Sequence, residues 1–146
     1  MPRRRSAEIG LLNQCGRCSL THMAITVRPL TLDDWPGLWP MLQDMGSNDE
    51  HPDIQRDRYA SLLDDPRWVV LGAHTDGELT GYAAAQDHGP HLRGGDDHRV
   101  ARLHDLYVRT DSRLTGVGRA LMTAVKQWAG HRVRYLEWQG FDAYVD

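Results

Sequence analysis

The sequence predicts a single mixed α/β domain whose mostly antiparallel sheet ends in a parallel β-α-β unit. The chain has 146 residues, a length that suits one domain built around one core. Apolar alternation and helical spacing predict the order β-α-α-β-β-β-α-β between residues 25 and 138. An Asp-Gly turn in the middle indicates a hairpin, and the final strand, helix and strand imply a parallel pair joined by a right-handed crossover.

Residues 1–22 show no periodicity, and we expect them to be a disordered or upstream-encoded leader. Met23 is then an alternative start, and residues 23–146 form the domain. The basic residues 3–5 are not followed by an apolar stretch of signal-peptide length. The formal net charge of −3 does not indicate nucleic acid or a membrane as a partner. No run of the sequence approaches the roughly 18 consecutive apolar residues of a spanning helix, so we expect a cytoplasmic protein.

The two cysteines, Cys15 and Cys18, form one C-x-x-C pair, followed by His22. A structural zinc site needs four ligands, and no second pair stands at the required spacing. No strand pattern precedes the cysteines, as a redox motif would require. We predict no metal site, and the role of the cysteines stays open. A zinc or nucleic-acid module built on them would require metal in the purified protein.

The first half of the domain is predicted to contain one strand and two helices. Ile25 and Val27 alternate with polar residues, as in a half-buried strand. Residues 31–34 resemble a capping box, and apolar residues then follow helical spacing up to Met45. Pro40 is expected to kink or split that helix. A second helix is predicted at 54–63.

The middle of the chain is predicted to form a hairpin followed by a long loop. Residues 68–72 form the first strand, the turn lies at 75–78, and residues 79–86 return. The polar, glycine-rich segment 88–98 is expected to be an exposed, mobile loop or a cover over a site. Its histidines, His88, His91 and His98, have no fixed geometry for a metal.

The last predicted unit is a strand at 100–108, a helix at 116–129 and a strand at 133–138. Two glycines, Gly116 and Gly118, open the helix although glycine weakens helices. A first helical turn has free N–H groups and the positive end of the macrodipole, and Arg113 and Arg119 add charge. This combination favours a phosphate site, although glycines at such a junction can also serve a tight turn. A P-loop and a dinucleotide fingerprint both fit the residues poorly.

Residues 113–118, Arg-Leu-Thr-Gly-Val-Gly, match R/Q-x-x-G-x-G/A at the head of a helix that follows a central strand. In this the chain resembles the GNAT family of N-acetyltransferases, over roughly residues 23–139. The resemblance implies a GNAT-like fold with the parallel β-α-β at the cofactor site. It also implies an acyltransferase that transfers the acetyl group of acetyl-CoA to a primary amine of a small molecule or peptide.

The same resemblance implies where acetyl-CoA binds. Backbone amides of residues 114–119 would hold the pyrophosphate, and backbone groups of residues 106–108 would pair with the pantetheine arm. The strand 135–138 would be splayed away to admit the cofactor. The implied cofactor-binding residues are Leu106, Tyr107, Val108, Arg113, Leu114, Thr115, Gly116, Val117, Gly118 and Arg119.

His104 and Asp105 are the candidate catalytic residues, because they lie on the strand beside the implied thioester site. Strand alternation predicts that they point to opposite faces. A histidine has a suitable pKa for a general base, although an ordinary hydrogen-bonded strand residue explains His104 equally well and a structural role would also explain Asp105. Acceptor-site candidates on the first helices are Trp35, Trp39, Asp44, Asp49 and Glu50, which solvated helix ends would also explain.

The family fold continues after its fifth strand with a helix and two more strands, for which residues 139–146 are too few. The sequence therefore predicts a domain that is incomplete at its C-terminus. The strand at 133–138 would then be an exposed edge, which predicts marginal stability or a sheet completed by a second chain, as in a homodimer. An alternative function is a catalytically impaired remnant that binds coenzyme A or serves as an assembly module.

Overall fold

The computed structural model describes residues 24–47, 49–92 and 95–138, except for the side chains of residue 91 and residues 95–98. The predicted order of strands and helices is confirmed. The predicted leader 1–22, both cysteines and residues 139–146 lie outside the described residues. The elements are β1 (Ile25–Pro29), η1 (Leu32–Asp34), α2 (Trp35–Asp44), α3 (Pro52–Asp64), β2 (Trp68–Thr75), β3 (Glu78–His91), β4 (Gly95–Val108), η2 (Thr110–Ser112), α4 (Val117–Gly130) and β5 (Tyr135–Glu137).

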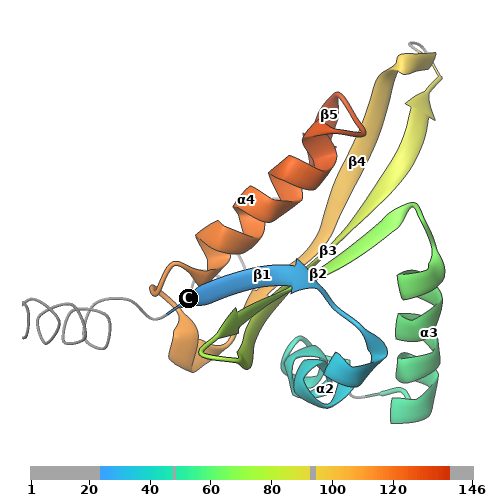
Figure 1. Ribbon diagram of the computed structural model, residues 1–146. Helices are drawn as coiled ribbons and strands as arrows, with labels where there is room; N and C mark the ends of the chain where they lie inside the picture. Colours follow the sequence, from blue (N-terminus) through green and yellow to red (C-terminus); the bar gives the residue numbers. More distant parts are fainter. Residues whose placement is uncertain (1–23, 48, 93–94, 139–146) are drawn as a thin grey trace, which may run out of the picture.

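The strands form one sheet in the order β1-β2-β3-β4-β5. The first four strands pair antiparallel, and β4 and β5 pair parallel, as the final strand-helix-strand unit predicts. Helix α4 covers one face of the sheet, and α2 and α3 cover the other (Figure 1). Each face therefore has its own apolar core. The core under α4 is built from Leu71, Ala73, Ala83, Ala85, Leu103, Val117, Leu121 and Val125.

The turn between β2 and β3 has the predicted Asp-Gly conformation. Asp76 and Gly77 have φ angles of 52° and 84°, both in the left-handed region. Two such residues in a row give a turn whose twist matches that of the flanking strands. Pairing therefore begins directly at the turn, with Thr75 opposite Glu78, and a bulge follows after the next pair, where Thr80 is the extra residue.

The prediction of a loop at residues 88–98 is wrong. Strands β3 and β4 continue through most of this segment, with Gly89 opposite Val100 and Pro90 opposite Arg99. In a two-stranded ribbon every second residue bonds across the pair and the backbone groups of the others are open to water, so the ribbon needs no apolar alternation. Composition pointed to a loop because glycine and polar residues are rare in strands that face a core.

Pro40 does not split α2, which is continuous from Trp35 to Asp44. Proline removes the hydrogen bond to the carbonyl of residue i−4, which is that of Pro36 here. Both prolines are exposed, so this carbonyl can be hydrated. The predicted capping box is present at η1, where the Thr31 N–H donates to Asp34 Oδ2 at 2.8 Å.

Strand β5 is shorter than the predicted 133–138. The Val133 N–H donates to the Ala129 carbonyl at 2.8 Å, so this residue still closes the end of α4. Pairing with β4 begins at Tyr135 and ends at Glu137. Leu136 packs into the core under α4, whereas Tyr135 and Trp138 are each 47% exposed.

Candidate active site

A bulge in β4 determines the directions of the two predicted catalytic side chains. Ala84 pairs with Asp105 and Ala85 pairs with Leu103, so His104 is the extra residue of the bulge. A bulge shifts the alternation of a strand by one residue. His104 stacks on Trp68 and Asp105 bonds to Tyr82, and both partners belong to the core under α2 and α3. The expectation that His104 and Asp105 point to opposite faces is therefore wrong.

His104 is held on two sides. Its ring stacks on that of Trp68 with centroids 4.8 Å apart, and its Nε2 lies 3.0 Å from Gln86 Oε1. If Nε2 donates to this amide oxygen, Nδ1 carries the free lone pair. Burial lowers the pKa of His104, and the charges of Arg102 and His88 lower it further. The imidazole is therefore neutral near pH 7 and able to accept a proton.

Asp105 is a half-buried carboxylate with one hydrogen-bonded oxygen. The Tyr82 hydroxyl donates to Asp105 Oδ2 at 3.2 Å. Burial raises the pKa of Asp105 because the charged form loses hydration, and the Tyr82 bond opposes this effect. The carboxylate also borders a hollow between α2, α3 and the sheet. Asp105 can therefore meet a ligand on this face.

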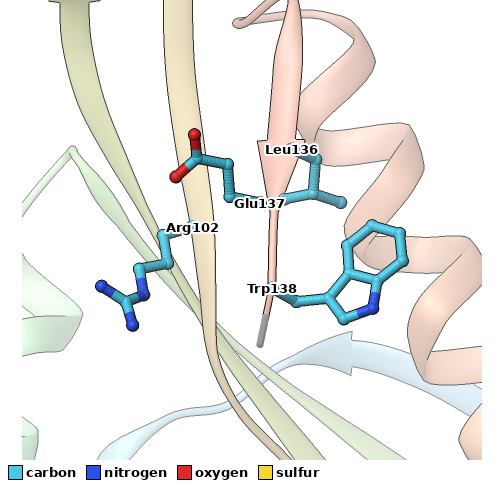
Figure 2. A pocket seen from close by; sticks show the side chains of 4 residues that line it. All are labelled: Arg102, Leu136, Glu137 and Trp138. Carbon is cyan, nitrogen blue, oxygen red and sulfur yellow. The ribbon is translucent and has the colours of Figure 1, made fainter. Parts of the chain in front are cut away.

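Beyond residue 102, β4 separates from β5. The parallel pairing covers Val100 to Arg102 against Tyr135 to Glu137, and within the described residues β5 pairs with nothing further along β4. A hollow of about 460 Å³ lies at this separation (Figure 2). Its lining consists of Arg102, Leu136, Glu137 and Trp138. The edge of β4 up to Val108 thus has backbone groups on the side away from β3 that β5 does not pair with, although the Val108 carbonyl accepts a hydrogen bond from Arg113 Nε at 3.2 Å.

The head of α4 carries the two glycines of the motif, and only one of them is explained by the chain itself. Gly116 is the N-cap and has a φ of 95°, which glycine adopts most easily. Gly118 has no such angle, and a Cβ there would meet only the Val108 side chain at an ordinary 3.6 Å. The tight-turn explanation therefore accounts for Gly116 but not for Gly118. A ligand approaching the backbone would account for both.

The loop before α4 is suited to an anion. Leu114 has a φ of 65° and a fully exposed side chain, so residues 114 and 116 are both left-handed. Ala120 makes the first intrahelical donation, to the Gly116 carbonyl at 3.0 Å, so the N–H groups of 117–119 precede the helical ladder. Arg113 and Arg119 are exposed, and neither forms an ion pair with a carboxylate of the described residues. Free N–H groups, helix dipole and cations together favour phosphate.

The structure does not bring the predicted acceptor residues together. Trp35 and Trp39 stack at 5.4 Å, and Trp35 packs against the core. Asp44 accepts a hydrogen bond from the Tyr107 hydroxyl at 2.5 Å and borders a separate hollow. Glu50 pairs with Arg58, and Asp49 is exposed. Sequence reasoning also missed Gln86, Trp68 and Tyr82, because their roles depend on strand register.

Comparison with known proteins agrees with this fold and site. The model of the acetyltransferase (GNAT) family matches residues 27–143. An aminoglycoside N(6')-acetyltransferase type 1 from Stenotrophomonas maltophilia is 32% identical over 92 residues, which are 63% of this chain. The matched stretch spans about half (54%) of that relative's length.

Solved structures show the same fold. A ribosomal-protein-alanine N-acetyltransferase from Brucella melitensis biovar Abortus 2308 superposes with a TM-score of 0.66 at 25% identity, covering 83% of each chain. The aminoglycoside N-acetyltransferase AAC(6')-Iy, solved in complex with CoA, gives a TM-score of 0.72 at 18% identity, over 85% of this chain and 82% of that one.

The sheet is mixed, its parallel strands β4 and β5 separate beyond residue 102, and the N-terminus of α4 is suited to an anion. These features together define a protein of the acetyltransferase fold class. The family match covers most of the chain, so the protein belongs to the acetyltransferase (GNAT) family. Within the described residues, no helix is both long and apolar enough to cross a membrane.

Proposed function

We propose that this protein is an N-acetyltransferase that transfers the acetyl group of acetyl-CoA to a primary amine of a small molecule or peptide. Family membership supports the reaction class, and the curated relative is named as an N-acetyltransferase. The observation that carries the proposal is Gly118, a glycine that neither backbone conformation nor packing explains, at the head of α4.

The residues at the head of α4 and along β4 fit the cosubstrate. N–H groups of residues 114–119 would hold the pyrophosphate, with Arg113 and Arg119 as counter-charges. The open edge at residues 106–108 would pair with the amide groups of the pantetheine arm, as an added strand pairs with a sheet edge. The hollow beside Leu136 and Trp138 lies along the same edge. Acetyl-CoA supplies the acetyl group as a reactive thioester.

His104 would act as the general base. A primary ammonium must lose a proton before its nitrogen can attack, and the neutral imidazole can accept that proton at Nδ1 while Nε2 is bound to Gln86. The amine nitrogen bonds to the acetyl carbon, and the carbon–sulfur bond breaks. The sulfur leaves with the electron pair of that bond and is then protonated. Asp105 would stay close to the amine rather than take its proton.

The proposal is tested by replacing Gly118 with leucine and measuring the affinity for coenzyme A by calorimetry. Leucine favours a helix more than glycine does, so the fold should be retained while the side chain obstructs the phosphates. We expect the affinity to fall by about tenfold or more, the equivalent of ~1.4 kcal/mol. Gly130→Leu is the matched control, because its Cβ would meet nothing within 4 Å on the same helix. Unchanged affinity in Gly118→Leu, or no thiol release from acetyl-CoA with any amine, would contradict the proposal.

A further inference from the structure

The hollow between α2, α3 and the sheet has a lining that defines the chemistry of a ligand. Its volume is about 220 Å³, below the roughly 300–1,000 Å³ of drug-sized sites. Asp105 is the one carboxylate among the described residues of this lining. The apolar lining residues are Leu38, Leu42, Leu62, Val70 and Ala84, with Tyr59 and Tyr82 beside them. The hollow therefore combines a single acidic group with a mainly apolar wall.

Asp105 has capacity for a further partner. Its Oδ2 accepts from the Tyr82 hydroxyl, whereas its Oδ1 accepts no hydrogen bond from the residues that the structure describes. A carboxylate removed from bulk water is stabilised by a donor of opposite charge. A primary ammonium carries three N–H donors and one positive charge, so it matches this oxygen in both respects. His104 lies on the same face because of the bulge and stands next to this group in the chain.

The other charged group of the lining is already neutralised. Arg58 donates through both Nη atoms to Glu50, at 2.8 and 2.9 Å, and Gln55 donates to the same carboxylate at 2.6 Å. An anionic ligand would be repelled by Asp105, and the described lining offers no free cation to offset this repulsion. A polycation would need several carboxylates, and this lining offers one. The charges therefore select a ligand with a single positive charge.

We infer that the hollow at Asp105 binds the acceptor, and that the acceptor is a small primary amine on an apolar stem rather than a polycationic sugar. The ammonium would lie at Asp105 Oδ1, and the stem would lie among Leu38, Leu42 and Leu62. The inference rests on the proposed function, because it names the amine that the reaction acetylates. It differs from the substrate in the name of the curated relative, an aminoglycoside.

The test measures binding of three amines to the full chain by calorimetry and NMR, without acetyl-CoA. The amines are 2-phenylethylamine, ethanolamine and the polycation kanamycin. We expect 2-phenylethylamine to bind at least about tenfold more tightly than ethanolamine, because burial of an aromatic ring is favourable. In the wild-type protein, its addition should shift the NMR signals of the Tyr82 ring and the Leu42 methyls.

Two variants assign the ammonium position. Asp105→Asn keeps the shape of the side chain and should weaken binding of 2-phenylethylamine by about tenfold or more, as expected for loss of a charge-assisted bond. Asp57→Asn is the matched control on α3, because Asp57 is exposed and outside the lining. Tighter binding of kanamycin, or an Asp105→Asn variant that binds 2-phenylethylamine as the wild type does, would overturn the inference. If Asp105→Asn does not fold, the wild-type shifts at Tyr82 and Leu42 decide the site.

Turnover separates this inference from the proposed function. Acetyl transfer to kanamycin or ethanolamine with a higher kcat/KM than to 2-phenylethylamine would overturn the substrate class and leave the transferase proposal intact. Binding of 2-phenylethylamine at Asp105 without thiol release would support the amine site and contradict the transferase proposal.

Discussion

The two faces of the sheet are packed differently. Under α4 the core consists of aliphatic residues and alanines, and Leu121 and Val125 are fully buried. Under α2 and α3 the core includes three tyrosines whose hydroxyls reach polar partners, among them Asp44 and Asp105. Burial raises the pKa of Tyr107 to about 12, so its hydroxyl keeps its proton and donates to Asp44. The face under α4 thus contributes mainly to stability. The face under α2 and α3 is less closely packed and contains hollows that carboxylates border.

The largest expected effect concerns the polar face. Replacing His104 with glutamine should lower kcat/KM by about 10²–10⁴-fold, the usual contribution of a general base. In the wild type, kcat/KM should fall as the pH drops through the lowered pKa of His104, because the imidazolium has no lone pair to accept a proton. This acidic limb should be absent from the variant. Rates of thiol release between pH 5 and 9 test both points, and an unchanged limb in the variant would exclude His104 as the base.

The second effect concerns the apolar face. Leu121→Ala should reduce the free energy of unfolding by about 2–5 kcal/mol, because the leucine is fully buried and its removal leaves a cavity. Coenzyme A affinity, measured well below the unfolding transition, should change little, since the side chain lies away from the helix head. Urea unfolding curves measure the loss. If Leu121→Ala cost less stability than Tyr107→Phe, which removes only a hydroxyl, the face under α4 would not be the main source of stability.

A smaller effect is expected from the residue that orients the base. Gln86→Leu removes the acceptor of His104 Nε2, and the ring then keeps its contacts with the rings of Trp68 and His88. We expect kcat to fall by about tenfold, or ~1.4 kcal/mol, with little change in KM. Gln86→Glu should restore much of the rate lost in Gln86→Leu. It should also raise the pKa of His104 and so move the acidic limb to higher pH, because a carboxylate favours the imidazolium. A purely structural role of Gln86 would leave the pH profile unmoved.

The smallest expected effect concerns an ion pair beside β1. It tests electrostatics apart from the packing of the two faces of the sheet. The side-chain bond from Arg28 holds the pKa of Asp34 well below its usual range, and the Thr31 bonds add to this. The folded-state pKa is depressed, so the contribution is full above about pH 4, decreases below it, and is lost only as the pH falls through the depressed pKa of Asp34. Asp34→Asn should therefore cost about 1 kcal/mol or less at pH 7 and a smaller amount at pH 3. Unfolding curves at pH 7 and pH 3 measure the difference.

The order of elements could be predicted because periodicity is local. The apolar stripe of α4 and the Asp-Gly turn are complete within a few residues of sequence, and both are confirmed. The ribbon at residues 88–98 could not be predicted, because pairing between two distant backbones stabilises it and their side chains do not report that pairing.

The candidate site was predictable only in part for the same reason. The Gly116–Gly118 motif can be read in one stretch, whereas the partners of His104 are 18 and 36 residues away, on β3 and β2. The direction of Asp105 depends on which residue of β4 is left unpaired, and this is decided by β3. Residue types at one position cannot reveal a register that two strands determine together.

The bulge at His104 has a consequence for the whole strand, because it changes the phase of the side-chain alternation. Leu103 and Leu106 are three residues apart, and a regular strand would send them to opposite faces. Both nevertheless pack under α4. A spacing of three between core residues inside a strand therefore indicates an inserted residue, at which the alternation of side chains changes phase. Deleting His104 would therefore leave Leu106 and Val108 under α4, whereas pairing His104 in a regular register would carry both to the polar face and turn Tyr107 into the apolar core.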